Sequence, residues 1–202
     1  MKFIVRLKKL ESMISVLLGV MFIAMVLIAY WGNFQYAYEL TFLSNALTGL
    51  FLLTTTVLKR KGKEIPQILY LDFTVLLFMV FLICIAFISE FTFTGAIFFL
   101  HVINPLVLMV YFFLYNDMNK ISKVSSVLTI IIMPLAYLVF AVIYGRITDN
   151  YIYFFLNYKE KGIAYSVIFV CIVAVGLIAI GYGIFFFNRY LHRKTGKLEL
   201  DT

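Results

Sequence analysis

The sequence predicts an all-α integral membrane protein, built as one bundle of six transmembrane helices. Residues of the AVILMFWYC set make up 64% of the 202-residue chain, where about 45–50% apolar residues are usual for a soluble domain. Charged residues make up only 13%, roughly half of their ordinary share. The apolar residues form six separate runs, each close to the about 20 residues that a bilayer-spanning helix needs.

The composition excludes several other classes of protein. A soluble domain of this size still leaves about 30% of its unfolded surface in water, which does not fit a mean hydropathy of +1.02. Two cysteines are too few for a disulfide-stapled secreted scaffold. We attribute the net charge of +7 to membrane topology and contact with the lipid surface, and we expect no nucleic-acid partner.

The six expected spans follow one another with short connections. Basic residues precede the first run, but its apolar stretch exceeds the about 7–15 residues of a signal-peptide core and no small-residue cleavage site follows. We therefore expect a retained first helix. No linker or repeat divides the chain, so residues 1–202 are expected to form a single domain. The expected spans comprise about residues 12–30, 40–58, 68–89, 94–115, 124–144 and 162–188.

Lysine and arginine predict the orientation of the chain, because short loops that carry them stay in the cytoplasm. Three residues of this kind lie on one side of the expected bundle: Arg146, Lys159 and Lys161. Fourteen lie on the other side: Lys2, Arg6, Lys8, Lys9, Lys59, Arg60, Lys61, Lys63, Lys120, Lys123, Arg189, Arg193, Lys194 and Lys197. We therefore expect cytoplasmic N- and C-termini. The Ile-, Phe- and Lys-rich composition favours a bacterial plasma membrane.

Polar side chains within the expected spans are the candidates for function, because polar groups are costly in hydrocarbon. Thr41, Ser44 and Asn45 open the second span at spacing i, i+3, i+4, which places them on one helix face. Two interpretations stay open for this face. It either bonds neighbouring helices together or forms part of a polar pocket.

The fourth span contains the single intramembrane histidine, His101, with Asn104 on the same face and Pro105 next to it. Pro105 lacks an N–H, so we expect a bend here and a free carbonyl at His101. A hydrogen-bonded structural histidine and a functional one are both open, since imidazole titrates near neutral pH. Tyr137 in the fifth span is expected at a similar depth to His101, roughly 10 Å from the outer end. Thr41 reaches this depth if the second span begins near Gln35.

Two further features have a structural and a functional interpretation. Asp72 near the cytoplasmic end of the third span either forms an ion pair with Lys59 or Arg60, or it binds a proton or cation. The aromatic outer loop, residues 146–161, is either an interfacial anchor or a lid. Cys84 and Cys171 are expected to act as small apolar residues. CxxC, Walker, GxGxxG and HExxH motifs are absent, so no cofactor and no metal are expected.

Taken together, these motifs resemble one family along nearly the whole chain. They are residues 40–45 (LTFLSN), 101–105 (HVINP), 134–137 (PLAY) and 151–155 (YIYFF). In their order they are similar to the androgen-induced integral-membrane hydrolases and their bacterial six-span relatives, and the spacing from His101 to Pro105 is closer to the bacterial branch. The resemblance implies a threonine nucleophile at Thr41 and a histidine base at His101. Animal members of this family hydrolyse esters of fatty acids with hydroxy fatty acids.

Two functions from different classes follow. The first is an intramembrane hydrolase of a lipid-like ester, in which Thr41 attacks, His101 is the base, and Ser44, Asn45 or Tyr137 donates to the oxyanion. The second is a non-enzymatic membrane module: a small transporter, a lipid-binding protein or an accessory protein. Membrane lipids are the expected partners in both cases. The sequence makes no prediction of the oligomeric state.

Overall fold

The computed structural model describes residues 2–87 and 95–200, and the side chains of residues 10–86 and 95–194. Over that part of the chain the regular structure is helical throughout, without strands. Six segments are long and apolar enough to cross a membrane: Leu10–Ala29, Leu40–Arg60, Gln67–Ala86, Gly95–Tyr115, Val124–Thr148 and Ile163–Lys194. The prediction of six spans is confirmed. The expected boundaries at residues 89 and 94 lie outside the described residues.

Helices α1 (Lys2–Ala29) and α2 (Leu40–Arg60) pack against each other over much of their length. The connection between them contains the short helix η1 (Phe34–Tyr36). Gly19 and Gly49 face each other across this pair, and a Cβ atom built on either one would lie 2.9 Å from the carbonyl oxygen of the other. Small residues allow such close approach of two helices in a membrane. This contact fixes the position of α2 and of the polar residues that open it.

The next helices complete a compact group around α2. Helix α3 (Gln67–Phe87) packs against α5 (Asn104–Tyr115), which follows the short α4 (Gly95–Phe98) and the π-helix η2 (Phe99–Ile103). The core of this group is apolar. Its fully buried residues include Phe22, Leu52, Leu71, Leu77 and Phe112.

The fifth span begins differently from the regular helix that the sequence predicts. After η3 (Met118–Lys120), the segment η4 (Val124–Ile131) is a 3₁₀-helix, and α6 (Ile132–Thr148) continues from it. Pro134 is the third residue of α6. In the first turn the backbone N–H groups have no partner within the helix, so proline is tolerated there.

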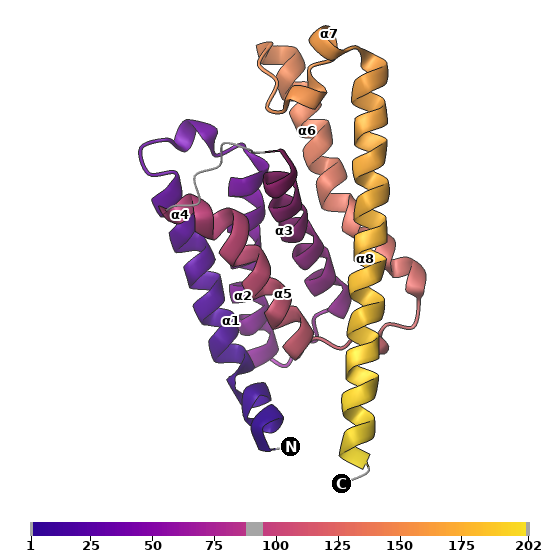
Figure 1. The fold of residues 1–202 in the computed structure, drawn as a ribbon. Helices are drawn as coiled ribbons and strands as arrows, with labels where there is room; N and C mark the ends of the chain where they lie inside the picture. The colour runs from indigo at the N-terminus through magenta and orange to yellow at the C-terminus, as the bar shows by residue number, and fades with distance from the viewer. Residues whose placement is uncertain (1, 88–94, 201–202) are drawn as a thin grey trace.

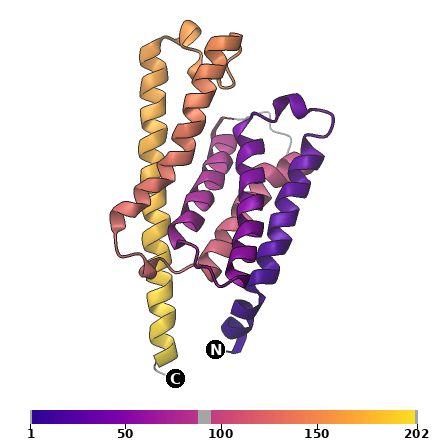
Figure 2. The same ribbon diagram turned by 180° about the vertical axis from the view of Figure 1, so that it is seen from behind.

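Helices α6 and α8 (Ile163–Leu200) lie together on one side of the bundle formed by α1, α2, α3 and α5 (Figure 1, Figure 2). The first residues of α1 and the last of α8 lie at the same end of the molecule, here called the terminal end. Side chains on α8 tie it to the loop after α5. Asn188 Oδ1 accepts from the N–H of Met118 at 2.9 Å, and Arg189 Nε donates to the Met118 carbonyl at 3.0 Å.

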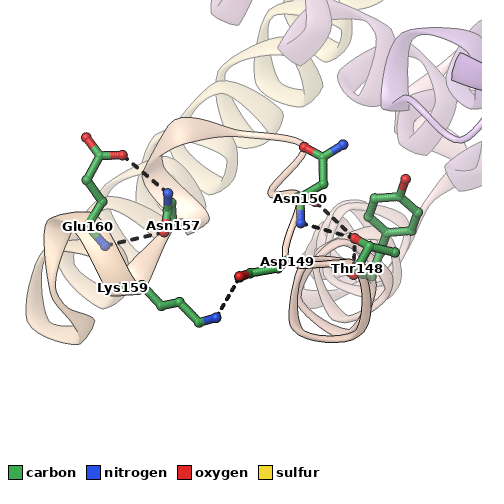
Figure 3. A network of polar contacts seen from close by, with 7 residues as sticks. Thr148, Asp149, Asn150, Asn157, Lys159 and Glu160 are labelled. Carbon is green, nitrogen blue, oxygen red and sulfur yellow. Dashed lines mark hydrogen bonds and ion pairs between the residues drawn. The ribbon is translucent and has the colours of Figure 1, made fainter.

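The loop between α6 and α8 contains η5 (Phe154–Leu156) and α7 (Tyr158–Lys161). Its outer surface is polar and exposed, with an ion pair of 2.6 Å between Lys159 Nζ and Asp149 Oδ1 (Figure 3). Asn157 caps α7 by accepting from the N–H of Glu160. An aromatic residue of the loop instead contacts a helix: Phe155 stacks on Phe169 of α8 at 4.4 Å between ring centroids. The loop is therefore folded onto α8 by its aromatic side chains.

Candidate functional site

The side chains of Thr41 and His101 meet where α2 begins. The distance between Thr41 Oγ1 and His101 Nε2 is 3.1 Å, which is within hydrogen-bonding range. Thr41 is the second residue of α2, and His101 lies on the π-helix η2, 60 residues further along the chain. Both side chains are only partly buried. The two residues that the family resemblance singles out are thus in direct contact.

The backbone of α4 determines which nitrogen of His101 can accept a proton. The other ring nitrogen, Nδ1, lies 3.0 Å from the carbonyl oxygen of Ile97. A carbonyl oxygen only accepts hydrogen bonds, so Nδ1 must carry the hydrogen. In a neutral imidazole Nε2 is then the acceptor, and it faces the hydroxyl of Thr41. This is the arrangement of a general base next to the hydroxyl that it activates.

The π-helix and Pro105 together create a carbonyl without a helical partner. The N–H of Asn104 bonds to the Phe99 carbonyl, whereas in a regular α-helix it would bond to Leu100. The next N–H that could reach the Leu100 carbonyl would belong to residue 105, and proline has none. Asn45 Nδ2 on α2 donates a hydrogen bond to this carbonyl instead, at 3.2 Å. The sequence predicts a free carbonyl at His101, whereas the π-turn places one at Leu100.

Asn45 is the centre of a buried amide network that joins α2 to α5. Its Nδ2 also donates to the Thr41 carbonyl at 2.9 Å, and its Oδ1 accepts from Asn104 Nδ2 at 2.7 Å. Both amides are fully buried. The Ser44 hydroxyl donates to the Thr41 carbonyl at 3.3 Å. In this arrangement the side-chain hydrogens of Asn45 are already committed to two carbonyls, so Asn45 positions Thr41 and Leu100.

A cavity of about 330 Å³ reaches His101 from the connection between α1 and α2. Its polar lining includes Tyr30, Asn33 and Glu39. The Tyr30 hydroxyl donates to Glu39 Oε2 at 2.7 Å, and burial together with this carboxylate raises the pKa of Tyr30. Glu39 is not among the site residues predicted from the sequence. Its position in the sequence could have indicated it, because Glu39 is the one acidic residue between the first two spans and directly precedes the residues that open α2.

Tyr137, expected near Thr41 and His101, lies against a different face of α2. It lines one cavity with Leu40 and Ser44, and a second with Leu40 and Tyr153. Its ring centroid is 6.2 Å from that of Tyr153. The first turn of α2 thus separates Tyr137 from the contact of Thr41 with His101. Of the expected cluster, Thr41, Ser44, Asn45, His101 and Asn104 come together, and Tyr137 does not join them.

The ion pair expected for Asp72 is wrong. Lys59 Nζ lies 2.5 Å from Glu11 Oε1 on α1, and Arg60 is exposed. The buried carboxyl of Asp72 instead contacts the hydroxyl of Thr129 on η4, at 2.8 Å. Lysine at the end of α2 finds an acidic partner on the neighbouring helix α1, which the sequence alone did not show to be adjacent.

Within the described side chains, no three His, Cys, Asp or Glu residues gather into a group that could hold a metal ion. The free cysteines lie apart, with Cys84 buried on α3 and Cys171 exposed on α8. Comparison of the chain with family models, curated proteins and solved structures gives no match.

Proposed function

We propose that this multi-pass membrane protein is an intramembrane hydrolase of lipid-like esters, with Thr41 as the nucleophile and His101 as the base. The observation that carries the proposal is the orientation of His101. Its Nδ1–H is held by the Ile97 carbonyl, and its Nε2 lies 3.1 Å from Thr41 Oγ1. A threonine hydroxyl is a weak nucleophile until an adjacent base removes its proton.

The reaction would proceed by acyl transfer to Thr41. His101 Nε2 takes the hydroxyl proton while Oγ1 forms a bond to the ester carbonyl carbon. The tetrahedral intermediate then collapses, the alcohol leaves, and it takes the proton back from His101 Nε2. A water molecule, deprotonated by the same nitrogen, next attacks the acyl-threonine. The bond between the acyl carbon and Thr41 Oγ1 breaks, Oγ1 takes the proton from His101 Nε2, and the carboxylic acid is released. Glu39 lines the cavity that reaches His101, so its carboxylate favours the imidazolium that forms in each half of the cycle.

The first turn of α2 supplies the oxyanion donors in this mechanism. Thr41 is the second residue of the helix, so its own N–H and that of Phe42 are among the first-turn groups that have no partner inside the helix. The positive end of the helix dipole lies at the same place. These backbone groups replace Ser44 and Asn45, whose side-chain hydrogens bond to carbonyls.

The proposed setting is a plasma membrane, bacterial by composition, with both termini in the cytoplasm. The fourteen lysine and arginine residues on the side of the termini support this orientation. Thr41 and His101 then lie in the outer half of the bilayer, where an apolar ester could enter laterally from the lipid.

Labelling with a fluorophosphonate probe, which reacts with activated serine and threonine hydroxyls, tests the proposal. Purified wild type is compared with Thr41→Ala, His101→Ala and His101→Gln, and all three variants should lose labelling. Thr56→Ala is the matched control, because Thr56 lies on the same helix as Thr41. Its hydroxyl donates to the Leu52 carbonyl of that helix at 2.9 Å. Labelling that persists in Thr41→Ala, or is absent from a folded wild type, would overturn the mechanism.

A second candidate function, a lipid-binding module without catalysis, is favoured by a different cavity. This cavity of about 110 Å³ lies between α3, α6 and α8 and is lined almost wholly by apolar side chains, with Tyr137 and Tyr153 as exceptions. Cavities of this character bind apolar ligands. Crosslinking with a photoreactive fatty acid should mark Leu138 or Val173 in this case, and it should be unaffected by Thr41→Ala.

A further inference from the structure

Asp72 is a buried carboxyl in the part of α3 that lies toward the terminal end of the bundle. It is the sixth residue of α3 and is 5% exposed. Its Oδ1 lies 2.8 Å from the hydroxyl oxygen of Thr129, which belongs to the 3₁₀-helix η4. Helix α6 continues directly from η4, and α8 packs against η4. The contact therefore joins α3 to the segment that connects the bundle with α6 and α8 (Figure 1).

The hydroxyl of Thr129 has two acceptors and one hydrogen. Thr129 Oγ1 lies 2.8 Å from Asp72 Oδ1 and also 2.8 Å from the carbonyl oxygen of Ser126. A threonine hydroxyl donates only one hydrogen bond, and a carbonyl oxygen donates none. If Asp72 is ionised, one of these two short contacts joins two oxygen atoms with no hydrogen between them.

A proton on Asp72 satisfies both contacts. The carboxylic acid then donates to Thr129 Oγ1, and Thr129 donates to the Ser126 carbonyl, which gives a continuous chain of two hydrogen bonds. It also removes a charge from a buried position, where an unpaired ion is strongly unfavourable. Neither argument depends on the reaction proposed at Thr41 and His101.

The charged groups on the elements around α3 have other partners or lie at the surface. Lys59 on α2 is paired with Glu11 of α1. Arg189 on α8 donates to the carbonyls of Met118 and Ile121, and Asp117 accepts from the N–H of Asn119. Lys120 and Lys123 stand exposed at the ends of η3 and η4. The titratable groups on η2 and α5 are His101, which is engaged by Thr41 and Ile97, and Tyr111 and Tyr115.

We infer that Asp72 is a proton-binding site, occupied at neutral pH, which holds α3 to η4 through the chain Asp72–Thr129–Ser126. The ligand is a single proton, and the acid that binds it is neutral. Loss of this proton breaks one of the two hydrogen bonds at the junction and places a negative charge between α3 and η4. The junction between the bundle and the pair α6 and α8 is thereby sensitive to protonation.

Infrared difference spectroscopy of the full chain in lipid nanodiscs tests this inference. The spectrum of wild type minus Asp72→Asn at neutral pH should contain the carbonyl stretch of one protonated carboxylic acid. Asp149→Asn is the matched control: Asp149 is exposed and paired with Lys159, so its removal should delete only carboxylate bands. A difference spectrum for Asp72 that contains carboxylate bands alone would overturn the inference.

Thr129→Val supplies a second readout that does not require Asp72 to be changed. Valine has the shape of threonine without the hydroxyl, so the acid loses its acceptor while its surroundings stay apolar. The carboxylic acid band of the variant should persist and shift to higher frequency, as expected for an acid that no longer donates. A band at the wild-type frequency would show that the proton is not on the Asp72–Thr129 contact, and the inference would fail.

Discussion

Thr41 Oγ1 and His101 Nε2 lie 3.1 Å apart, although the two residues are 60 positions apart in the chain. The contact depends on two irregularities of the backbone. Thr41 lies in the first turn of α2, and His101 lies on a π-turn that is followed by proline. Irregular turns inside helices are frequent at functional sites.

Replacing Pro105 by alanine should reduce the reactivity of Thr41 without unfolding the protein. Alanine restores an N–H at position 105 that can bond to the His101 carbonyl, so the π-turn can relax to a regular α-helix. In that helix the Leu100 carbonyl accepts from the N–H of Asn104 and no longer depends on Asn45. A π-turn contains one residue more than an α-helical turn. When it relaxes, the helix before it rotates by about 100°, the angle of one residue in a 3.6-residue repeat, and His101 moves away from Thr41.

The measurement for Pro105→Ala is fluorophosphonate labelling together with the melting temperature in detergent. We expect labelling to fall at least tenfold and the melting temperature to stay equal or rise. Pro134→Ala is the control, because Pro134 lies in the first turn of α6 and away from the site. Full labelling of Pro105→Ala would mean that the proline does not set the orientation of His101.

Asn45→Ala should destabilise the protein as well as abolish labelling. The variant leaves the buried Leu100 carbonyl and the Asn104 amide without their partner, and an unsatisfied buried polar group costs about 1–3 kcal/mol. Thermal or denaturant unfolding in detergent measures this loss. Asn150→Ala, at an exposed position in the outer loop (Figure 3), should change the free energy of unfolding far less. Equal stability of the two variants would contradict the role given to Asn45.

The sequence predicted the number of spans and most members of the polar cluster, but not how the cluster is built. The spacing of Thr41 and Asn45 placed them on one face of α2. The long apolar runs predicted membrane-spanning helices, because a bilayer permits few other structures. Pro105 indicated a bend. It could not show that the bend is a π-turn, since that depends on Asn45 of another helix taking the Leu100 carbonyl.

Two expectations were wrong because they depended on which helices lie next to each other and how each helix is rotated. An ion pair of Asp72 with Lys59 or Arg60 was one of the two interpretations of Asp72, but α1 places Glu11 beside Lys59. Tyr137 was expected to join Thr41 because both lie at a similar depth. Depth fixes only one coordinate; the rotation of α6 about the bundle directs Tyr137 toward Leu40 and Tyr153 instead. Helix packing sets that rotation, and the periodicity of an all-apolar span carries little information about it.

The phenol of Tyr38 should ionise at a higher pH than a free tyrosine, and the folded protein should lose stability as the phenol ionises. Its hydroxyl donates to Tyr144, whose ring lies 4.7 Å away, and this hydrogen bond with burial raises the pKa of Tyr38 from 10.0 to about 12. The folded state therefore holds the proton more tightly than the unfolded state. The stabilisation is fully present below pH 10 and is lost as the pH rises from about 10 to about 12.

Phenolate absorbance, recorded as wild type minus Tyr38→Phe, isolates this titration. The midpoint should lie near pH 12 in wild type and move back toward 10 in a Tyr144→Phe background, because phenylalanine removes the acceptor. Tyr190→Phe, at an exposed position on α8, should leave the midpoint unchanged. A midpoint near 10 in wild type would mean that the contact between Tyr38 and Tyr144 does not hold the proton.

Gly49→Ala should separate α1 from α2 and thereby disturb Thr41 from a distance. A Cβ atom at this position would lie 2.8 Å from Ile23 Cγ1 and 2.9 Å from the Gly19 carbonyl oxygen, which is backbone and cannot move aside alone. Overpacking of this kind costs about 1–3 kcal/mol.

Gly176→Ala is the matched control. Gly176 lies inside α8 with no atom within 4 Å of its added Cβ, so the better helix propensity of alanine should stabilise the protein by roughly 0.5–1 kcal/mol. Unfolding in detergent should therefore shift in opposite directions for the two variants, and labelling should fall only in Gly49→Ala. If Gly49→Ala were as stable as Gly176→Ala, the helices would not meet at these glycines, and the position of Thr41 would need another cause.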